Sequence, residues 1–270
     1  MKIPEGKDAI RWFSETLQLT GVAHTDPEPE GDPALIGLRV GLVNGAAWIA
    51  AWSTYFGRKF LPGAHLINVG NEAVQINFMQ AHQAGQPVPP QSNIDRFVSY
   101  ARDLVQLSQV DVVLITCSTM NRAFPQVAAA LEPYGVPVVQ IDRPMMEAAV
   151  NHGGKVLVVA THGPTVENTQ ALLCETAAEL DKEVNYAGLN IETAWYRLAE
   201  GDVEGHNQAL ATGIRAGLAA EEIGCVVLAQ LSMSVFLLSY PDPENEFGIP
   251  VFTSGQCGFE AVRELLMGRE

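Results

Sequence analysis

The chain has 270 residues, a net charge of −15 and a hydrophobic fraction of 47%, a composition typical of a folded globular protein with a large core. Sixteen Lys and Arg against 31 Asp and Glu argue against nucleic acid or an anionic membrane as a partner. The sequence MKIPEGKDAI lacks the apolar core of a signal peptide, and no apolar run reaches the ~20 residues that span a bilayer. We therefore expect a cytoplasmic protein.

The elements follow one another as alternating strands and helices. A short helical stretch at 8–17 and the acidic, proline-rich segment HTDPEPEGDP come first, and we assign residues 1–35 to an N-terminal extension. After it, short β-branched runs alternate with amphipathic stretches, which is typical of parallel βαβ units and predicts an α/β fold. Strands are predicted at 39–43, 65–69, 111–116, 137–141, 155–160, 183–186, 225–229 and 250–253, and helices at 93–107, 122–131, 165–180, 205–220 and 256–267.

An internal repeat divides the chain into two halves. VLITCSTM at 113–120 aligns with VVLAQLSM at 226–233 at a shift of 113 residues, and RVGLVNG resembles KVLVVATHG. We predict two α/β lobes related by pseudo-twofold symmetry, a first at 36–150 to which a C-terminal helix at 255–270 returns, and a second at 151–254. Ligands bind beyond the carboxyl ends of parallel strands, so we expect the site in the cleft between the lobes.

Several kinds of chemistry lack their motifs. Neither GxGxxG nor GxxxxGK[ST] follows a predicted strand, and GxSxG is absent, which argues against nucleotide cofactors and against a hydrolase of the nucleophile-elbow type. The four cysteines are widely spaced, without CxxC or a histidine at metal-ligand spacing. The sequence therefore predicts no cofactor, no metal site and no disulfide framework.

Cys117 stands where chemistry is expected. It follows the strand at 111–116 and precedes Ser118 and Thr119, where we expect a helix to begin. Backbone N–H groups at a helix N-terminus stabilise anions, which favours a lowered thiol pKa and, with the two hydroxyls, a carboxylate site. The alternative is a small buried hydrophobic residue, the commonest role of a free cysteine.

These motifs resemble the cofactor-independent aspartate/glutamate/hydantoin racemase superfamily, which includes maleate isomerases and arylmalonate decarboxylases. VVLITCSTM matches the first cysteine motif, a strand ending in Cys-Asn-Thr; VLVVATHGPT is similar to the Thr-rich turn of the second half; VVLAQLSMS stands at the second cysteine motif. The resemblance covers 39–266. It implies two Rossmann-like lobes, a homodimer, and proton transfer at the α-carbon of a small carboxylate substrate.

One position departs from the family pattern. In two-cysteine members, one thiol removes the α-proton and the opposite thiol returns a proton to the other face; Cys117 matches the first thiol, but Gln230 stands at the second. A neutral amide is no base, although it can hydrogen-bond a carboxylate or an enolate. Three functions stay open: a racemase or isomerase with one catalytic thiol, a decarboxylase or lyase resembling arylmalonate decarboxylase, and a non-catalytic carboxylate-binding protein. The single cysteine of the arylmalonate decarboxylases is at the second position, unlike here.

Other polar residues at the strand ends complete the predicted site. His162 is a candidate second acid or base, with an exposed loop histidine as the alternative. For Asn44 the alternative to a functional role is a turn residue. For Thr165 and Ser232 the alternative is a helix cap. The predicted substrate-binding residues are Asn44, Ser118, Thr119, Thr161, Thr165, Gln230 and Ser232.

Overall fold

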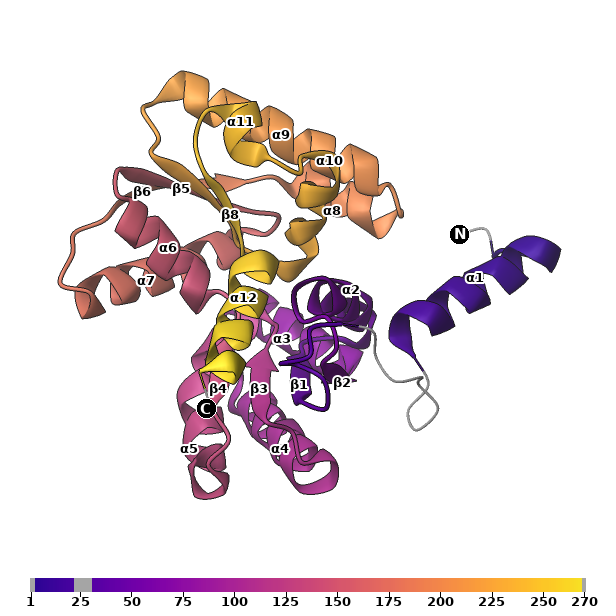
Figure 1. Ribbon diagram of the computed structural model, residues 1–270. Helices are drawn as coiled ribbons and strands as arrows, with labels where there is room; N and C mark the ends of the chain where they lie inside the picture. The colour runs from indigo at the N-terminus through magenta and orange to yellow at the C-terminus, as the bar shows by residue number, and fades with distance from the viewer. Residues whose placement is uncertain (1–2, 22–30, 269–270) are drawn as a thin grey trace.

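The computed structural model describes residues 3–21 and 31–268 and consists of two lobes, each built on a four-stranded parallel sheet (Figure 1). The strand orders are β2-β1-β3-β4 and β6-β5-β7-β8, so both sheets have the same topology and the predicted two-lobed α/β fold is confirmed. The strands are β1 (Arg39–Asn44), β2 (His65–Gly70), β3 (Val112–Ile115), β4 (Val138–Gln140), β5 (Lys155–Ala160), β6 (Asn185–Asn190), β7 (Cys225–Leu228) and β8 (Val251–Thr253).

The burial of the central strands explains why the sequence pattern predicts them. β3 and β7 are buried throughout, and β1 and β5 are buried except at their first residues; sequences rich in Val, Leu and Ile suit that position. The prediction of a strand at 183–186 is wrong in its bounds, since β6 runs from Asn185 to Asn190. β6 is a half-exposed edge strand with few β-branched residues, and its position is set by pairing with β5.

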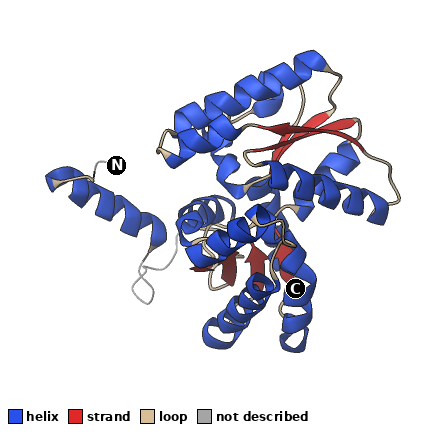
Figure 2. Cartoon of the chain, turned by 180° about the vertical axis from the view of Figure 1, so that it is seen from behind, coloured by secondary structure: helices blue, strands red, loops and turns tan. Residues whose placement is uncertain are grey.

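Helices cover both faces of each sheet (Figure 2), and the five predicted amphipathic helices are confirmed as α4, α5, α7, α9 and α12. The first sheet packs against α2 (Ala50–Phe60) and α12 (Ser254–Met267) on one face, and on the other against α3 (Glu72–Gln83), α4 (Gln91–Ser108) and α5 (Phe124–Leu131). The second packs against α6 (Arg143–His152) and α7 (Gly163–Glu179), and on the other face against α8 (Glu192–Ala199), α9 (Val203–Ala220), α10 (Phe236–Ser239) and α11 (Pro243–Phe247).

The two lobes exchange a helix. α6 follows β4 of the first sheet, but its Met145 and Met146 are buried in the core of the second lobe. α12 follows β8 of the second sheet, but its Phe259 and Val262 are buried against the first sheet. The two exchanged helices also pack against each other, and α12 runs between the lobes (Figure 1). This exchange holds the carboxyl ends of the two sheets in a fixed mutual position.

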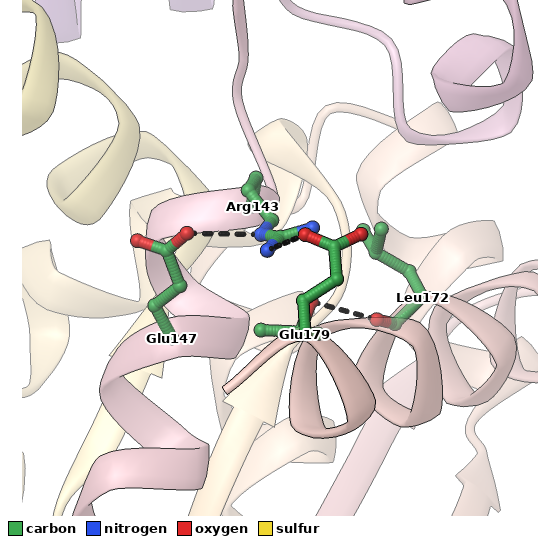
Figure 3. A network of polar contacts seen from close by, with 5 residues as sticks. Arg143, Glu147, Leu172 and Glu179 are labelled. Atoms are coloured by element: carbon green, nitrogen blue, oxygen red, sulfur yellow. Dashed lines mark hydrogen bonds and ion pairs between the residues drawn. The ribbon is translucent and has the colours of Figure 1, made fainter. Parts of the chain in front are cut away.

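A surface network joins α6 to α7. The Arg143 guanidinium donates from Nε to Glu147 at 2.9 Å and from a terminal nitrogen to Glu179 at 2.5 Å, as Figure 3 shows. Both carboxylates raise the pKa of Arg143, and Arg143 lowers the pKa of Glu179. The positive charge at the start of α6 is therefore paired with these two carboxylates.

The predicted N-terminal helix is confirmed as α1 (Gly6–Thr20). It contacts α2 of the first lobe and otherwise projects away from the two lobes (Figures 1 and 2). None of its residues is buried. Most of the segment HTDPEPEGDP lies outside the described residues. Across 3–21 and 31–268, no helix combines the length and the apolar character needed to cross a membrane.

Candidate active site

A cavity of about 110 Å³ is lined by residues of both lobes where their strands end. Because the strands of each sheet are parallel, the residues that follow them meet at one edge, and the two edges face this cavity. Six predicted site residues line it: Cys117, Ser118, Thr119, His162, Gln230 and Ser232. The other three, Asn44, Thr161 and Thr165, are buried and do not line it.

The internal repeat places Cys117 and Gln230 at equivalent points of the two lobes. Each residue follows the central strand β3 or β7, has an extended backbone and is the N-cap of a short 3-10 helix. These helices, Ser118–Ala123 and Leu231–Val235, begin 113 residues apart. The pseudosymmetry is therefore shared at the level of the backbone, while the side chains that enter the cavity differ.

The Cys117 thiol is tightly enclosed. Its Sγ lies 3.2 Å from Oγ1 of Thr119, and a methyl group added at Gly45 would overlap Sγ. Gly45 follows β1 directly, so the end of the neighbouring strand passes against the thiol. Only a residue without a side chain fits there, which gives the Asn44-Gly45 turn a function that the sequence did not reveal.

Burial raises the pKa of the Cys117 thiol, and the nearby Asp142 carboxylate raises it further. Hydrogen bonds from Thr119 and from the backbone N–H of Met120 act in the opposite direction but are outweighed. The expectation that the helix end lowers this pKa is therefore wrong, because desolvation of a thiolate exceeds the stabilisation by N–H groups. The resting group is a neutral thiol, able to donate a proton.

Asp142 is a functional candidate that sequence reasoning missed. It follows β4, is fully buried, and accepts a 2.7 Å hydrogen bond from Nδ2 of Asn121. Burial raises its pKa to about 6, although Asn121 and the hydroxyls of Ser118 and Ser254 lower it. Its position, a polar residue directly after a predicted strand, is the same signal that identified Cys117.

Asn44 lies behind the cavity wall. Its Oδ1 accepts hydrogen bonds from the hydroxyls of Ser53 and Thr116, both at 2.6 Å, and its Nδ2 donates to Asn68 at 2.9 Å. These bonds use the side chain to connect β1, β2, α2 and the end of β3. The structure thus gives Asn44 a role in holding the strand ends of the first lobe.

Gln230 is fixed from the second lobe. Its Oε1 accepts from both the backbone N–H and the hydroxyl of Thr161, each at 2.8 Å. Because a backbone N–H can only donate, this contact also identifies which end of the amide is oxygen. The part of Gln230 left for a ligand is its NH₂ group, a hydrogen-bond donor.

Thr165 is buried in the first turn of α7 in the second lobe. The helix α7 begins at Gly163, with His162 as its N-cap, so the alternative of Thr165 as the cap is wrong; Pro164 at the helix start moves the boundary forward. The Thr165 hydroxyl is buried without a hydrogen-bond partner among the described residues.

His162 is half-buried in the cavity wall, so the alternative of an exposed loop histidine is wrong. Its ring lies 4.7 Å from that of Trp195, centroid to centroid. Burial lowers the pKa of His162, and the Glu192 carboxylate opposes that shift. The imidazole is therefore neutral at neutral pH and able to accept a proton.

The fold and the site define a class: a two-lobed α/β protein whose pseudo-equivalent strand ends face one cavity, with a thiol on one side and an amide and an imidazole on the other. Among the residues described, no group of three or more His, Cys, Asp and Glu is arranged to hold a metal ion. The sequence profile of the Asp/Glu/Hydantoin racemase family matches residues 66–262, most of the chain, and the chain belongs to this family.

Solved structures share the fold at low identity. A glutamate racemase from Francisella tularensis in complex with D-glutamate has a TM-score of 0.60 and 15% identity, covering 85% of this chain and 81% of its own. An aspartate racemase homologue from Pyrococcus horikoshii has a TM-score of 0.58 and 19% identity, covering 84% of this chain and 98% of its own. An allantoin racemase from Klebsiella pneumoniae has a TM-score of 0.56 and 17% identity, covering 85% of this chain and 88% of its own. No curated protein matches the chain significantly.

Proposed function

We propose that the protein is a racemase-type isomerase that moves a proton at the α-carbon of a small carboxylate substrate, with Cys117 as the catalytic acid. Family membership supports the isomerase class. The observation that carries the finer statement is the neutral Cys117 thiol in the wall of the interlobe cavity, where it is the one cysteine among the described lining residues.

The cavity supplies donors for a carboxylate and for the enediolate that forms when the α-proton leaves. Ser118 and Thr119 line it at the start of a 3-10 helix, but the Ser118 hydroxyl is buried and acts on Asp142. The side-chain donors proposed for a ligand are therefore the Thr119 hydroxyl and the NH₂ group of Gln230. Fixed donors at developing negative charge supply a large share of enzymatic rate enhancement. These groups form the binding side of the proposed site.

Proton transfer needs one group on each face of the carbon. In the proposed step, neutral His162 takes the α-proton, and the Cys117 S–H bond breaks as the new C–H bond forms on the other face. The products are the inverted acid, an imidazolium and a thiolate; exchange of one proton with water restores the resting enzyme. His162 belongs to the second lobe and Cys117 to the first, which suits attack on opposite faces.

A second candidate is a decarboxylase or lyase. It is favoured by Gln230, whose amide oxygen is engaged by Thr161 and which cannot act as a second base. Loss of CO₂ creates the enediolate without any base, after which a single acid, Cys117, protonates it. The two candidates therefore share the acid and differ in whether His162 is needed.

The test is proton NMR in D₂O with amino acids, hydantoins, maleate and substituted malonates, using wild type, Cys117→Ala and His162→Asn. Cys174→Ala is the matched control, because Cys174 is exposed on α7 outside the cavity. Deuterium at an α-position that depends on Cys117 and His162 supports the isomerase, and CO₂ release that needs only Cys117 supports the lyase. No reaction with any compound, together with saturable binding of one of these carboxylates in calorimetry, indicates a carboxylate-binding protein; slow alkylation of Cys117 is expected in every case because its pKa is raised.

A further inference from the structure

The cavity is largely apolar away from the polar strand ends. No lysine or arginine is found among its described lining residues, so a second negative group on a ligand has no cation to meet there. Side chains from both lobes form this wall: Trp48, Val74, Phe78, Met79, Trp195 and Leu231.

Two indoles from opposite lobes define the aromatic part of the wall. Trp48 and Trp195 have ring centroids 6.0 Å apart at an interplanar angle of 58°. Trp48 is held by a 3.1 Å hydrogen bond from its Nε1 to Gln75 and by the edge of Trp52, 5.2 Å away. Trp195 is held against His162. The rings are therefore held by contacts within the protein, and they offer aromatic surface against which a flat ring can pack.

Acidic groups lie beside the same two indoles. The Glu72 carboxylate accepts a hydrogen bond from the backbone N–H of Trp48 at 3.2 Å, and the Glu192 carboxylate acts electrostatically on His162, the ring neighbour of Trp195. Both side chains are exposed and neither residue is among the described lining residues, so water screens their repulsion of a second carboxylate. The stronger reason to expect an uncharged second group is that the described lining holds no lysine or arginine.

We propose that the substrate is a carboxylic acid whose second substituent is flat, apolar and uncharged, such as an aryl ring, rather than an acid with a second carboxylate on its side chain. This inference rests on the proposed function for the location of the site. The carboxylate lies at the donors of Thr119 and Gln230, and the ring lies against Trp48 and Trp195. The cavity of about 110 Å³ is smaller than the ~150 Å³ apolar cavities that hold one benzene ring, so binding of a ring together with a carboxylate requires the cavity to widen or part of the ligand to lie outside it.

Isothermal titration calorimetry tests the inference without turnover, using phenylacetate and succinate as probes. Wild type is expected to bind phenylacetate at least ~10-fold more tightly than succinate, since the ring buries apolar surface and the described lining has no cation for a second carboxylate. Equal affinities, a preference for succinate, or no measurable phenylacetate binding overturns the proposal.

Charge introduced on α3 provides a matched pair of variants. Met79 and Ile76 are both exposed on this helix, at 37% and 55%, but only Met79 is among the residues that line the cavity. Met79→Arg is expected to reduce the preference for phenylacetate ~10-fold or more by attracting succinate, whereas Ile76→Arg leaves the ratio unchanged. An equal effect of both variants overturns the proposal, because it shows that overall charge and not the cavity sets the preference.

The outcomes separate this inference from the proposed function. Cys117-dependent deuterium exchange in aspartate or glutamate but in no aryl-substituted acid leaves the function intact and overturns the substrate class. Tight phenylacetate binding that Met79→Arg weakens, without exchange in any compound, supports the substrate class and contradicts the catalytic function.

Discussion

The two lobes have the same backbone at the cavity and opposite side-chain chemistry. In the first, Cys117 presents an uncharged thiol packed against Gly45. In the second, Gln230 has its amide oxygen fixed by two hydrogen bonds from Thr161. The shared backbone thus keeps equivalent positions at the cavity in both lobes, while the side chains at those positions differ in chemistry.

This asymmetry has a chemical meaning. Two equivalent thiols can exchange the parts of acid and base, so both directions of a racemisation use like groups. Here, in the proposed mechanism, the first lobe offers the acid, and the second offers the Gln230 amide donor and the imidazole of His162. We expect the two faces of a substrate carbon to be treated unequally, and the variants below test that difference lobe by lobe.

The largest effect is expected from Gly45→Ala. The added methyl group overlaps Sγ of Cys117 and must displace the thiol, and a misplacement of about 1 Å can cost ~100-fold in rate. The measurement is the rate of α-deuterium exchange, with circular dichroism to verify folding. Gly163→Ala, at the equivalent turn of the second lobe, is the control, because the nearest atom would be 3.9 Å from its new methyl group. Similar losses in both variants contradict the assigned role of Gly45.

The fold could be predicted from the sequence because its central strands are short segments rich in Val, Leu and Ile that are followed by polar residues. Cys117 and Gln230 follow such runs, and the 113-residue shift relates them correctly in the structure. β6 was misplaced because an edge strand has no obligatory apolar pattern and depends on its partner β5.

From the sequence, the site could be predicted only for residues that closely follow a predicted strand. The sequence does not show that Asn44 turns into a buried network while Gly45 faces the thiol, since a one-residue difference along an extended chain reverses the side-chain direction. Nor does it show that Trp48 and Trp195 meet, because they lie in different lobes and no local pattern relates them. Long-range packing determines these features.

The next effect concerns Asp142, a buried carboxyl of the first lobe. The 113-residue shift that relates the two lobes places Gly255 at the corresponding position, so the second lobe has no such carboxyl there. Since the folded-state pKa of Asp142 is raised to about 6 from 3.8, its stabilising protonated form is complete below about pH 4 and is lost as the pH rises through 6. Asp142→Asn is therefore expected to exceed wild type in free energy of unfolding by roughly 3 kcal/mol at pH 7.5, and by little at pH 4.

Urea denaturation between pH 4 and 8 measures this difference, and a gap that does not change with pH contradicts the assignment. The same variant tests the coupling to the thiol. The Asp142 carboxylate raises the pKa of Cys117, so Asp142→Asn should increase the rate of Cys117 alkylation at pH 8. A slower alkylation shows instead that Asp142 mainly positions the loop.

A smaller effect is expected in the second lobe from Gln230→Met. The change keeps the side-chain volume but leaves the N–H and hydroxyl of buried Thr161 without their acceptor, at a cost of about 1–3 kcal/mol in unfolding free energy. Thr161→Val removes only the hydroxyl and should cost less. Steady-state kinetics on the two variants then separates the contributions: a loss of activity in Gln230→Met alone identifies its NH₂ group as the part that contacts substrate.

The smallest effect, and the one that most directly separates burial from binding, is expected at Thr165. Its buried hydroxyl has no partner among the described residues, so Thr165→Val should raise the free energy of unfolding by about 1 kcal/mol. Thr176→Val, also buried on α7, removes a 2.7 Å hydrogen bond to the carbonyl of Leu172 and should lower it by a similar amount. Because Thr165 lies behind the cavity wall, kcat/KM should be unchanged in Thr165→Val; a rise in KM without the gain in stability would place its hydroxyl on the substrate.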